Sequence, residues 1–170
     1  HEYASFIKLT IFPAEMLPII STLRATVYAG IGLVLLLITQ VILSGHLAWT
    51  SCLLPLWLIS YIALLMGLTW FLSALGAFSR DVSYALMTFV PLLMFVTPVF
   101  FPREGLPPPV NLLIYLNIIT GYVEIVRDLV VFGRLPNGLV CLWTFAMSAF
   151  TFWGGYWFFL RNKDGIADVL

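Results

Sequence analysis

Long apolar stretches constrain this sequence more than any other feature. They occupy residues 16–43, 52–78, 84–100 and 138–160, and the third is the shortest. A helix that crosses a bilayer takes about 20 residues, so the crossing part of the first stretch is expected near 24–43. A span in lipid must satisfy its backbone hydrogen bonds internally, so each stretch is predicted to be a helix. The predicted fold class is an all-α integral membrane protein, a polytopic helix bundle with four spans.

The composition agrees with a membrane protein and excludes several other classes. Hydrophobic residues make up 62% of the chain and charged residues 9%, whereas a soluble domain is about half apolar and about a quarter charged. This excludes a soluble enzyme, a disordered tail and a disulfide scaffold. Eight Lys and Arg balance eight Asp and Glu, so no basic field is available to attract nucleic acid.

The chain offers no cofactor or metal chemistry of its own. It holds no nucleotide-binding loop, nucleophile elbow, HExxH or CxxC motif, so no catalytic residue is predicted. Cys52 and Cys141 lie at the edges of apolar stretches with no histidine nearby, and we expect small buried hydrophobes rather than metal ligands. The chain begins at His1 rather than Met and does not open with a signal peptide, so earlier segments are expected to be missing.

Lysine and arginine residues near the span ends predict the orientation. An N-terminus in the cytoplasm places five of them inside and three outside, as the positive-inside rule requires. The chain 1–170 is then one transmembrane domain with a cytoplasmic loop at 1–15, an outer loop at 101–137 and a cytoplasmic tail at 161–170. Arg24, one turn inside the first span, either reaches back to the inner surface or lines a polar path. The inner set is Lys8, Arg24, Arg80, Arg161 and Lys163, and the outer set is Arg103, Arg127 and Arg134.

Residues 101–137 do not have the pattern of a simple loop. Pro102 and the three prolines at 107–109 end a helix and favour extended backbone. Two apolar pieces follow, 110–119 and 122–132, and each is too short to cross a bilayer about 30 Å thick. We predict a re-entrant outer helical hairpin or an interfacial pair, which needs a cover of protein or a water-filled cavity and serves as a plug or as a gate. The residues that separate the pieces are Asn117, Thr120 and Gly121.

The second and last spans carry faces of small residues and of aromatic residues. Small residues at helical spacing predict close packing between helices in lipid. Aromatic residues at that spacing either face lipid or line a conduit on which sugar rings stack. The small faces hold Ala63 and Gly67 in the second span and Thr144, Ser148, Thr151 and Gly155 in the last. The aromatic residues are Trp57 and Tyr61 in the second span and Phe145, Phe152, Tyr156 and Phe159 in the last.

Glu124, Arg127 and Asp128 are the densest charges near membrane depth. Glu124 and Arg127 are three residues apart, so they can pair on one helix face. Because a charge at that depth is costly unless it is paired or wetted, the group is either an ion pair that fixes the hairpin or a functional site. The two carboxylates also match acid–base catalysis on a glycoside, but Arg127 between them in sequence would keep both ionised, which argues against a proton donor.

Several short motifs, in order along the chain, resemble those of type-2 ABC exporter permeases. The matching segments are FIKLTIFPAEMLP at 6–18 (a cytoplasmic loop), RDVSY at 80–84 (an inner turn), TPVFFP at 97–102 (the outer end of a span), YLN at 115–117, EIVRD at 124–128 and GRLP at 133–136 (an outer gate hairpin), and GIADVL at 165–170 (the C-terminal end). Their order over nearly the whole chain is more specific than any one motif. The branch that they most resemble exports lipid-linked polysaccharides: O-antigen, capsule or teichoic acid.

The resemblance implies the membrane subunit of a transporter in a bacterial cytoplasmic membrane. Such permeases work as homodimers with two ABC ATPase subunits, which would bind the ATP and Mg, and the substrate would be a lipid-linked glycan. The family has six spans, so the first two are expected to be missing. The family also carries proline after the Leu-Asn of the hairpin, where this chain has Ile118.

The resemblance also implies three sets of functional residues. The segment that couples to the ATPase would comprise Lys8, Phe12, Pro13, Glu15, Met16 and Leu17. The outer gate would comprise Pro98, Pro102, Tyr115, Asn117, Glu124, Arg127 and Asp128. A conduit would comprise Arg24, Trp57, Tyr61, Phe145, Phe152 and Tyr156.

Three other functions stay open at this point. A drug or small-lipid ABC exporter would share the fold and the coupling segment. A membrane-embedded glycan-modifying enzyme would use Glu124 and Asp128 and would turn over without ATP. A purely structural membrane partner would show no transport defect when the charges of the gate are neutralised.

Overall fold

All the secondary structure that the chain's computed structural model describes is helical. The described residues are 16–79, 81–99, 107, 114 and 117–169, and within them the predicted all-α class is confirmed. The elements are α2 (Met16–Ser44), the 3-10 helix η1 (Trp49–Leu53), α3 (Leu54–Phe78), α4 (Asp81–Val96), α6 (Ile118–Val126), the π-helix η2 (Arg127–Val131) and α7 (Gly138–Val169).

Within the described part of the chain, three helices are long and apolar enough to cross a membrane. They are Met16–Ser44, Trp49–Phe78 and Gly138–Lys163, which correspond to the first, second and fourth predicted spans. The chain therefore has the helices of a membrane protein. Helix α7 continues beyond the predicted span and includes most of the predicted tail.

The third predicted span, 84–100, is represented by the shorter helix α4. At 16 residues and 1.5 Å per residue, α4 is about 24 Å long, less than the hydrocarbon core of about 30 Å. The helix ends at Val96, and Thr97 and Pro98 follow. A residue before proline is disfavoured in the α conformation, which explains why the helix ends here.

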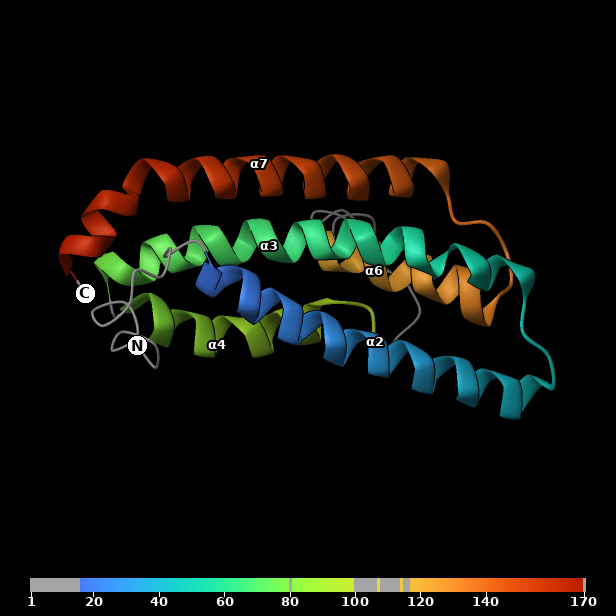
Figure 1. Cartoon of the computed structure of the whole chain (residues 1–170). Helices are drawn as coiled ribbons and strands as arrows, with labels where there is room; N and C mark the ends of the chain where they lie inside the picture. Colours follow the sequence, from blue (N-terminus) through green and yellow to red (C-terminus); the bar gives the residue numbers. More distant parts are fainter. Residues whose placement is uncertain (1–15, 80, 100–106, 108–113, 115–116, 170) are drawn as a thin grey trace.

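Three long helices, α2, α3 and α7, make up most of the bundle, and two shorter ones, α4 and α6, lie in its opposite halves (Figure 1). Figure 1 shows that the start of α2, the end of α3, the start of α4 and the end of α7 all lie toward the left. The predicted orientation requires this, because it places the segments attached to these four helix ends on the same side of the membrane. Helix α4 stops part-way along the bundle, and α6 with η2 continues toward the right end. Among the described residues between the end of α3 and the start of α7, the helical segments are the half-length helices α4 and α6, with η2 after α6.

Backbone contact between α3 and α7 holds the bundle together. A Cβ atom built on Gly67 would collide with the backbone of Thr151 and Phe152, and one built on Gly155 would collide with the backbone of Gly67. This confirms the predicted small-residue seam. Without a hydrophobic driving force in lipid, such close approach supplies the van der Waals contact that holds helices together.

Candidate functional site

The half of the bundle away from the α3–α4 connection holds helix α6, which is too short to cross a membrane. Helix α6 begins at Ile118. The side-chain oxygen of Asn117, the residue before it, caps the helix by accepting a hydrogen bond from the Ile119 N–H at 3.1 Å. Thr120 and Gly121 lie inside α6 and are buried, so the expected break at these two residues is wrong. Gly121 is instead the point of close approach to the Thr144 side chain of α7.

The predicted hairpin is therefore described only in its second half. Residues 118–131 form one continuous helical unit, α6 followed by η2. The sequence had predicted the second apolar piece at 122–132, so the helix begins four residues earlier than expected. Six of the ten residues of the first piece, 110–119, lie outside the described residues, so the hairpin itself stays a prediction.

Two side chains connect α6 and η2 to the end of α4. The amide nitrogen of Asn117 donates to the Thr97 hydroxyl at 2.8 Å. Nη2 of Arg127 donates to the carbonyl of Pro98 at 2.6 Å and lies 3.4 Å from that of Val99. The last carbonyls of a helix have no partner within it, and in an apolar bundle they need one. Asn117 and Arg127 thus join the two half-helices, and Arg127 also satisfies carbonyls that follow α4.

Three hydroxyl groups join α6 to the long helices. The Tyr122 hydroxyl lies 2.8 Å from Ser60 Oγ of α3 and 2.5 Å from Ser148 Oγ of α7, and the two serines are 3.2 Å apart. All three residues are buried. Because no water competes in such an environment, hydroxyl pairs of this kind fix the position of one helix against another.

Helix η2 is also held by η1, which lies between α2 and α3. Thr50 Oγ1 donates to the Leu129 carbonyl at 2.7 Å, and Ser51 Oγ lies 3.4 Å from the same oxygen. The chain leaves η2 through Gly133, whose φ of 61° lies in the left-handed region that favours glycine. Both ends of the half-helix are therefore tied to neighbouring elements by named hydrogen bonds.

One of the three clustered charges, Asp128, has a partner that the sequence did not indicate. We expected Arg127 to neutralise both carboxylates, but the carboxylate of Asp128 pairs with Arg134, with Nε 2.8 Å from Oδ1. Neighbouring residues on a helix point about 100° apart, so Arg127 reaches the carbonyls after α4 while Asp128 faces the exposed turn beyond η2. Glu124 lies half-buried on α6.

The aromatic residues predicted for a conduit lie mostly between α3 and α7. Trp57 packs on Phe145 with ring centroids 4.7 Å apart. Phe152 and Tyr156 both pack on Trp70, at 5.4 and 4.9 Å. These contacts add stacking to the backbone seam.

Part of the predicted conduit and part of the predicted gate meet at one cavity. Its volume is about 570 Å³, and it lies between α2, α3 and α6. Trp57 and Tyr61 line it from α3, and Tyr122 and Arg127 line it from α6 and η2. Tyr61 and Tyr122 also pack edge to face, with centroids 5.4 Å apart. Apart from Trp57, Tyr61, Tyr122 and Arg127, the side chains that line the cavity are apolar.

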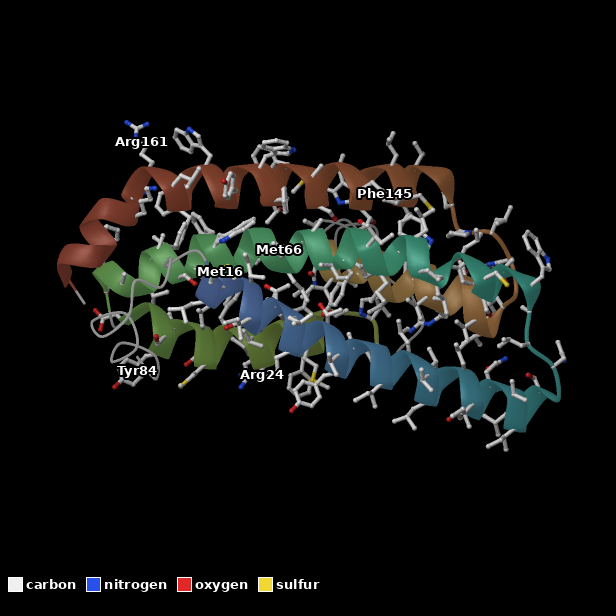
Figure 2. The ribbon with its side chains drawn as sticks, viewed as in Figure 1. Met16, Arg24, Met66, Tyr84, Phe145 and Arg161 are labelled. Atoms are coloured by element: carbon white, nitrogen blue, oxygen red, sulfur yellow. The ribbon has the colours of Figure 1, made fainter. Side chains whose placement is uncertain are left out.

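The remaining predicted residues lie away from this cavity or outside the description. Figure 2 shows Arg24 on the side of α2 that faces away from α3, and its side chain is exposed. Met16 is exposed and Leu17 half-buried at the start of α2. Lys8, Phe12, Pro13, Glu15, Pro102 and Tyr115 lie outside the described residues.

The sequence indicated some of these contacts and missed others. Thr97, Ser60 and Tyr122 were not predicted as site residues, although each is a hydroxyl inside an apolar stretch. Their place within apolar stretches could have identified them, because a hydroxyl group surrounded by lipid or apolar side chains requires a hydrogen-bond partner. The partner itself depends on how the helices pack.

Searches for known relatives give no identification. No protein-family model matches the chain, and no curated protein matches it.

Proposed function

We propose that this chain is the membrane-spanning permease subunit of an ABC transporter that exports lipid-linked polysaccharide across the cytoplasmic membrane of a bacterium. A separate ATPase subunit supplies the energy, and two permease copies form the transporter. The full permease would have six spans and a re-entrant outer hairpin, of which α6 and η2 are the second half. The ordered motifs of the sequence are the first support for this proposal.

The main structural support is the divided path through the bundle. A half-length helix in the outer half, joined by Arg127 to carbonyls beyond α4 and by Tyr122 to α3 and α7, is suited to a gate. A continuous helix cannot open locally, whereas two half-helices joined by hydrogen bonds can separate as units. The second support is topological: the start of α2 and the α3–α4 connection lie toward one end of the bundle, where a single ATPase partner can contact both.

The test is export by the complete transporter. The full-length permease, expressed with its ATPase subunit in cells that make the glycan, is expected to deliver glycan to the surface, measured by immunolabelling of intact cells. Arg127→Gln is expected to abolish delivery at unchanged permease abundance. Arg134→Gln is the matched control, because this arginine lies seven residues away and its side chain is 63% exposed.

A second experiment addresses energy coupling. A double substitution in the coupling segment, Phe12→Asp with Glu15→Lys, introduces one charge and reverses another, and it is expected to stop delivery while the ATPase subunit still hydrolyses ATP. Delivery that persists in this double variant would refute the proposal. Turnover of a glycan by the purified permease without ATP would instead establish the enzymatic alternative.

A drug or small-lipid exporter is the second candidate, and the cavity favours it. Its volume of about 570 Å³ falls within the range of about 300–1,000 Å³ that is typical of small-molecule sites. Deletion of the gene separates the two functions. Loss of surface glycan is expected from the leading proposal, and increased sensitivity to apolar drugs with intact glycan from the second.

A further inference from the structure

Arg24 projects from the side of α2 that faces away from α3 (Figure 2). Its side chain is exposed, as are those of Ile20 and Tyr28, one turn to either side. Thr22 points the other way, and its hydroxyl lies 3.2 Å from that of Thr69 on α3. The arginine therefore lies on the surface of the described bundle.

The contact between Thr22 and Thr69 fixes the level of Arg24 along the bundle. Helices α2 and α3 run in opposite directions (Figure 1), so a residue two positions after Thr22 is level with one two positions before Thr69. That residue is Gly67, whose backbone approaches that of Thr151 on α7. Arg24 is therefore level with the backbone contact between α3 and α7.

This level is close to the middle of the two spans that meet there. They are Trp49–Phe78 and Gly138–Lys163, and Gly67 and Thr151 lie near their midpoints. At 1.5 Å per residue, Arg24 is then about 5 Å or less from mid-depth. The surface of a hydrocarbon core about 30 Å thick is about 10 Å from its Cα atom, beyond an extended arginine side chain. Reaching back to the inner surface would therefore require the bilayer to thin locally.

A cation at this depth is costly unless an anion or water accompanies it. The carboxylates of the described residues lie at other levels. Asp81 begins α4 beside the end of α3, and Glu124 and Asp128 belong to α6 and η2 in the other half of the bundle. Positions 164 and 168 follow the span in α7. No carboxylate of the described residues is therefore level with Arg24.

The face of α2 around Arg24 is otherwise apolar. Besides Arg24 and Tyr28, its exposed side chains are Ile20, Leu23, Val27, Ile31, Val34 and Leu35, and we call this set the Arg24 face. A water-filled path needs polar groups along its wall, and this face supplies one cation and one phenol. An apolar face with one charge is instead suited to another membrane helix, which packs on the apolar residues and brings the counter-charge.

A second copy of this chain does not supply that counter-charge from its described residues. Two Arg24 faces packed about a two-fold axis would bring two guanidinium groups together, and the described carboxylates of the copy lie at other levels. We propose that the Arg24 face binds a transmembrane helix of a different protein that carries one Asp or Glu at mid-depth. This inference goes beyond the proposed function and does not rest on it.

The experiment uses designed helices in place of the unidentified partner. The first peptide is a Leu/Ala helix of about 24 residues with lysines at both ends and Glu at its centre. The second has Gln at the centre, and the third has Glu two turns away, about 11 Å along the helix. Each is added to the full-length protein in phosphatidylcholine vesicles. Association is measured by energy transfer from a dye on the exposed Cys52 to a dye on the peptide, with Cys141→Ser to leave one labelling site.

The protein is expected to bind the central-Glu peptide about tenfold or more tightly than the Gln peptide, a difference of about 1.4 kcal/mol. The third peptide is expected to bind like the Gln peptide. Arg24→Gln is expected to remove the preference, and Arg24→Lys to restore part of it, because lysine keeps the charge without the planar fork. Arg161→Gln is the matched control, since this arginine is exposed at the far end of α7 over the Trp157 ring, and it is expected to keep the preference.

Equal binding of the Glu and Gln peptides, or a preference that survives Arg24→Gln, would overturn the inference. So would a preference that appears only when Glu2, Glu15 and Glu104, which lie outside the described residues, are all changed to Gln, because one of them would then already pair with Arg24. Energy transfer between two labelled copies that is lost in Arg24→Gln would assign the face to a second copy and overturn it too. Because Arg24 is exposed, its variants are expected to unfold at the wild-type temperature, so a lost preference reports binding rather than folding.

Discussion

The close approach of α3 and α7 leads to a sharp prediction about two adjacent glycines. In α7, a Cβ atom on Gly155 would collide with the backbone of Gly67, whereas one on Gly154 would meet nothing within 4 Å. The same substitution, glycine to alanine, therefore tests one position inside the interface and its neighbour outside it. Both residues are in the interior of the same helix.

The expected sizes follow from the atoms involved. Overpacking of a tight interface costs about 1–3 kcal/mol, and alanine recovers about 0.5–1 kcal/mol through its better helix propensity. The atoms that face Gly155 belong to the backbone and cannot rotate away. We therefore expect Gly155→Ala to lower the free energy of unfolding by about 2 kcal/mol, and Gly154→Ala to raise it by about 0.5–1 kcal/mol.

The assay is thermal unfolding of the purified chain in one detergent. For a chain of this size, 1 kcal/mol corresponds to about 2–4 °C. Gly155→Ala is then expected to lower Tm by about 4–8 °C, and Gly154→Ala to raise it by about 1–4 °C. Equal shifts for the two variants would refute direct backbone contact between α3 and α7.

Three further changes test the ties of the half-helix. Tyr122→Phe removes the hydroxyl shared with two buried serines and is expected to cost about 0.6–1.7 kcal/mol, measured by the same unfolding assay. Asn117→Ala removes the cap of α6 and the bond to Thr97, and the loss of the cap alone is expected to cost about 1 kcal/mol. Its effect is measured as faster amide hydrogen exchange at the start of α6. Asp128→Asn breaks an ion pair whose arginine is exposed, so a double-mutant cycle with Arg134→Gln is expected to give a coupling of about 1 kcal/mol or less.

Each of these changes has a control or a result that contradicts it. Tyr28→Phe alters a tyrosine that is 69% exposed on α2 and is expected to leave Tm unchanged. Asn117→Asp keeps an oxygen for the cap but loses the donor to Thr97, so exchange as fast as in Asn117→Ala would show that the cap contributes nothing. A coupling of several kcal/mol between residues 128 and 134 would contradict the weak pairing expected from the exposed side chain of Arg134.

The sequence predicted the long helices well because lipid leaves few alternatives. Three of the four predicted spans correspond to helices of sufficient length, since an apolar stretch in a bilayer must form its own hydrogen bonds. The small-residue seam was also predicted, because periodicity places Thr144, Ser148, Thr151 and Gly155 on one face. Gly155 and Gly67 do meet there.

The errors arose where contacts between distant segments decide the structure. Thr120 and Gly121 have the character of a turn, yet both are buried inside α6, where Gly121 lies against Thr144. The partner of Asp128 is six residues further along the chain, beyond η2. Local sequence patterns predict which residues are neighbours on one helix. The contact of Gly121 with Thr144 involves a second helix, and the pair of Asp128 with Arg134 forms across a turn, so neither follows from such a pattern.

The sequence by itself determined the class of the chain and the positions of its long helices, because the cost of an unsatisfied backbone group in lipid leaves only helices there. It did not determine how the outer half of the bundle is closed. Only the tertiary structure showed that α4 stops early, that Arg127 reaches the carbonyls after it, and that a cavity with that cation in its wall lies between α2, α3 and α6. The physical reason is that hydrogen bonds and cavities at this depth join residues some 20–90 positions apart, such as Thr97 with Asn117 and Ser60 with Ser148.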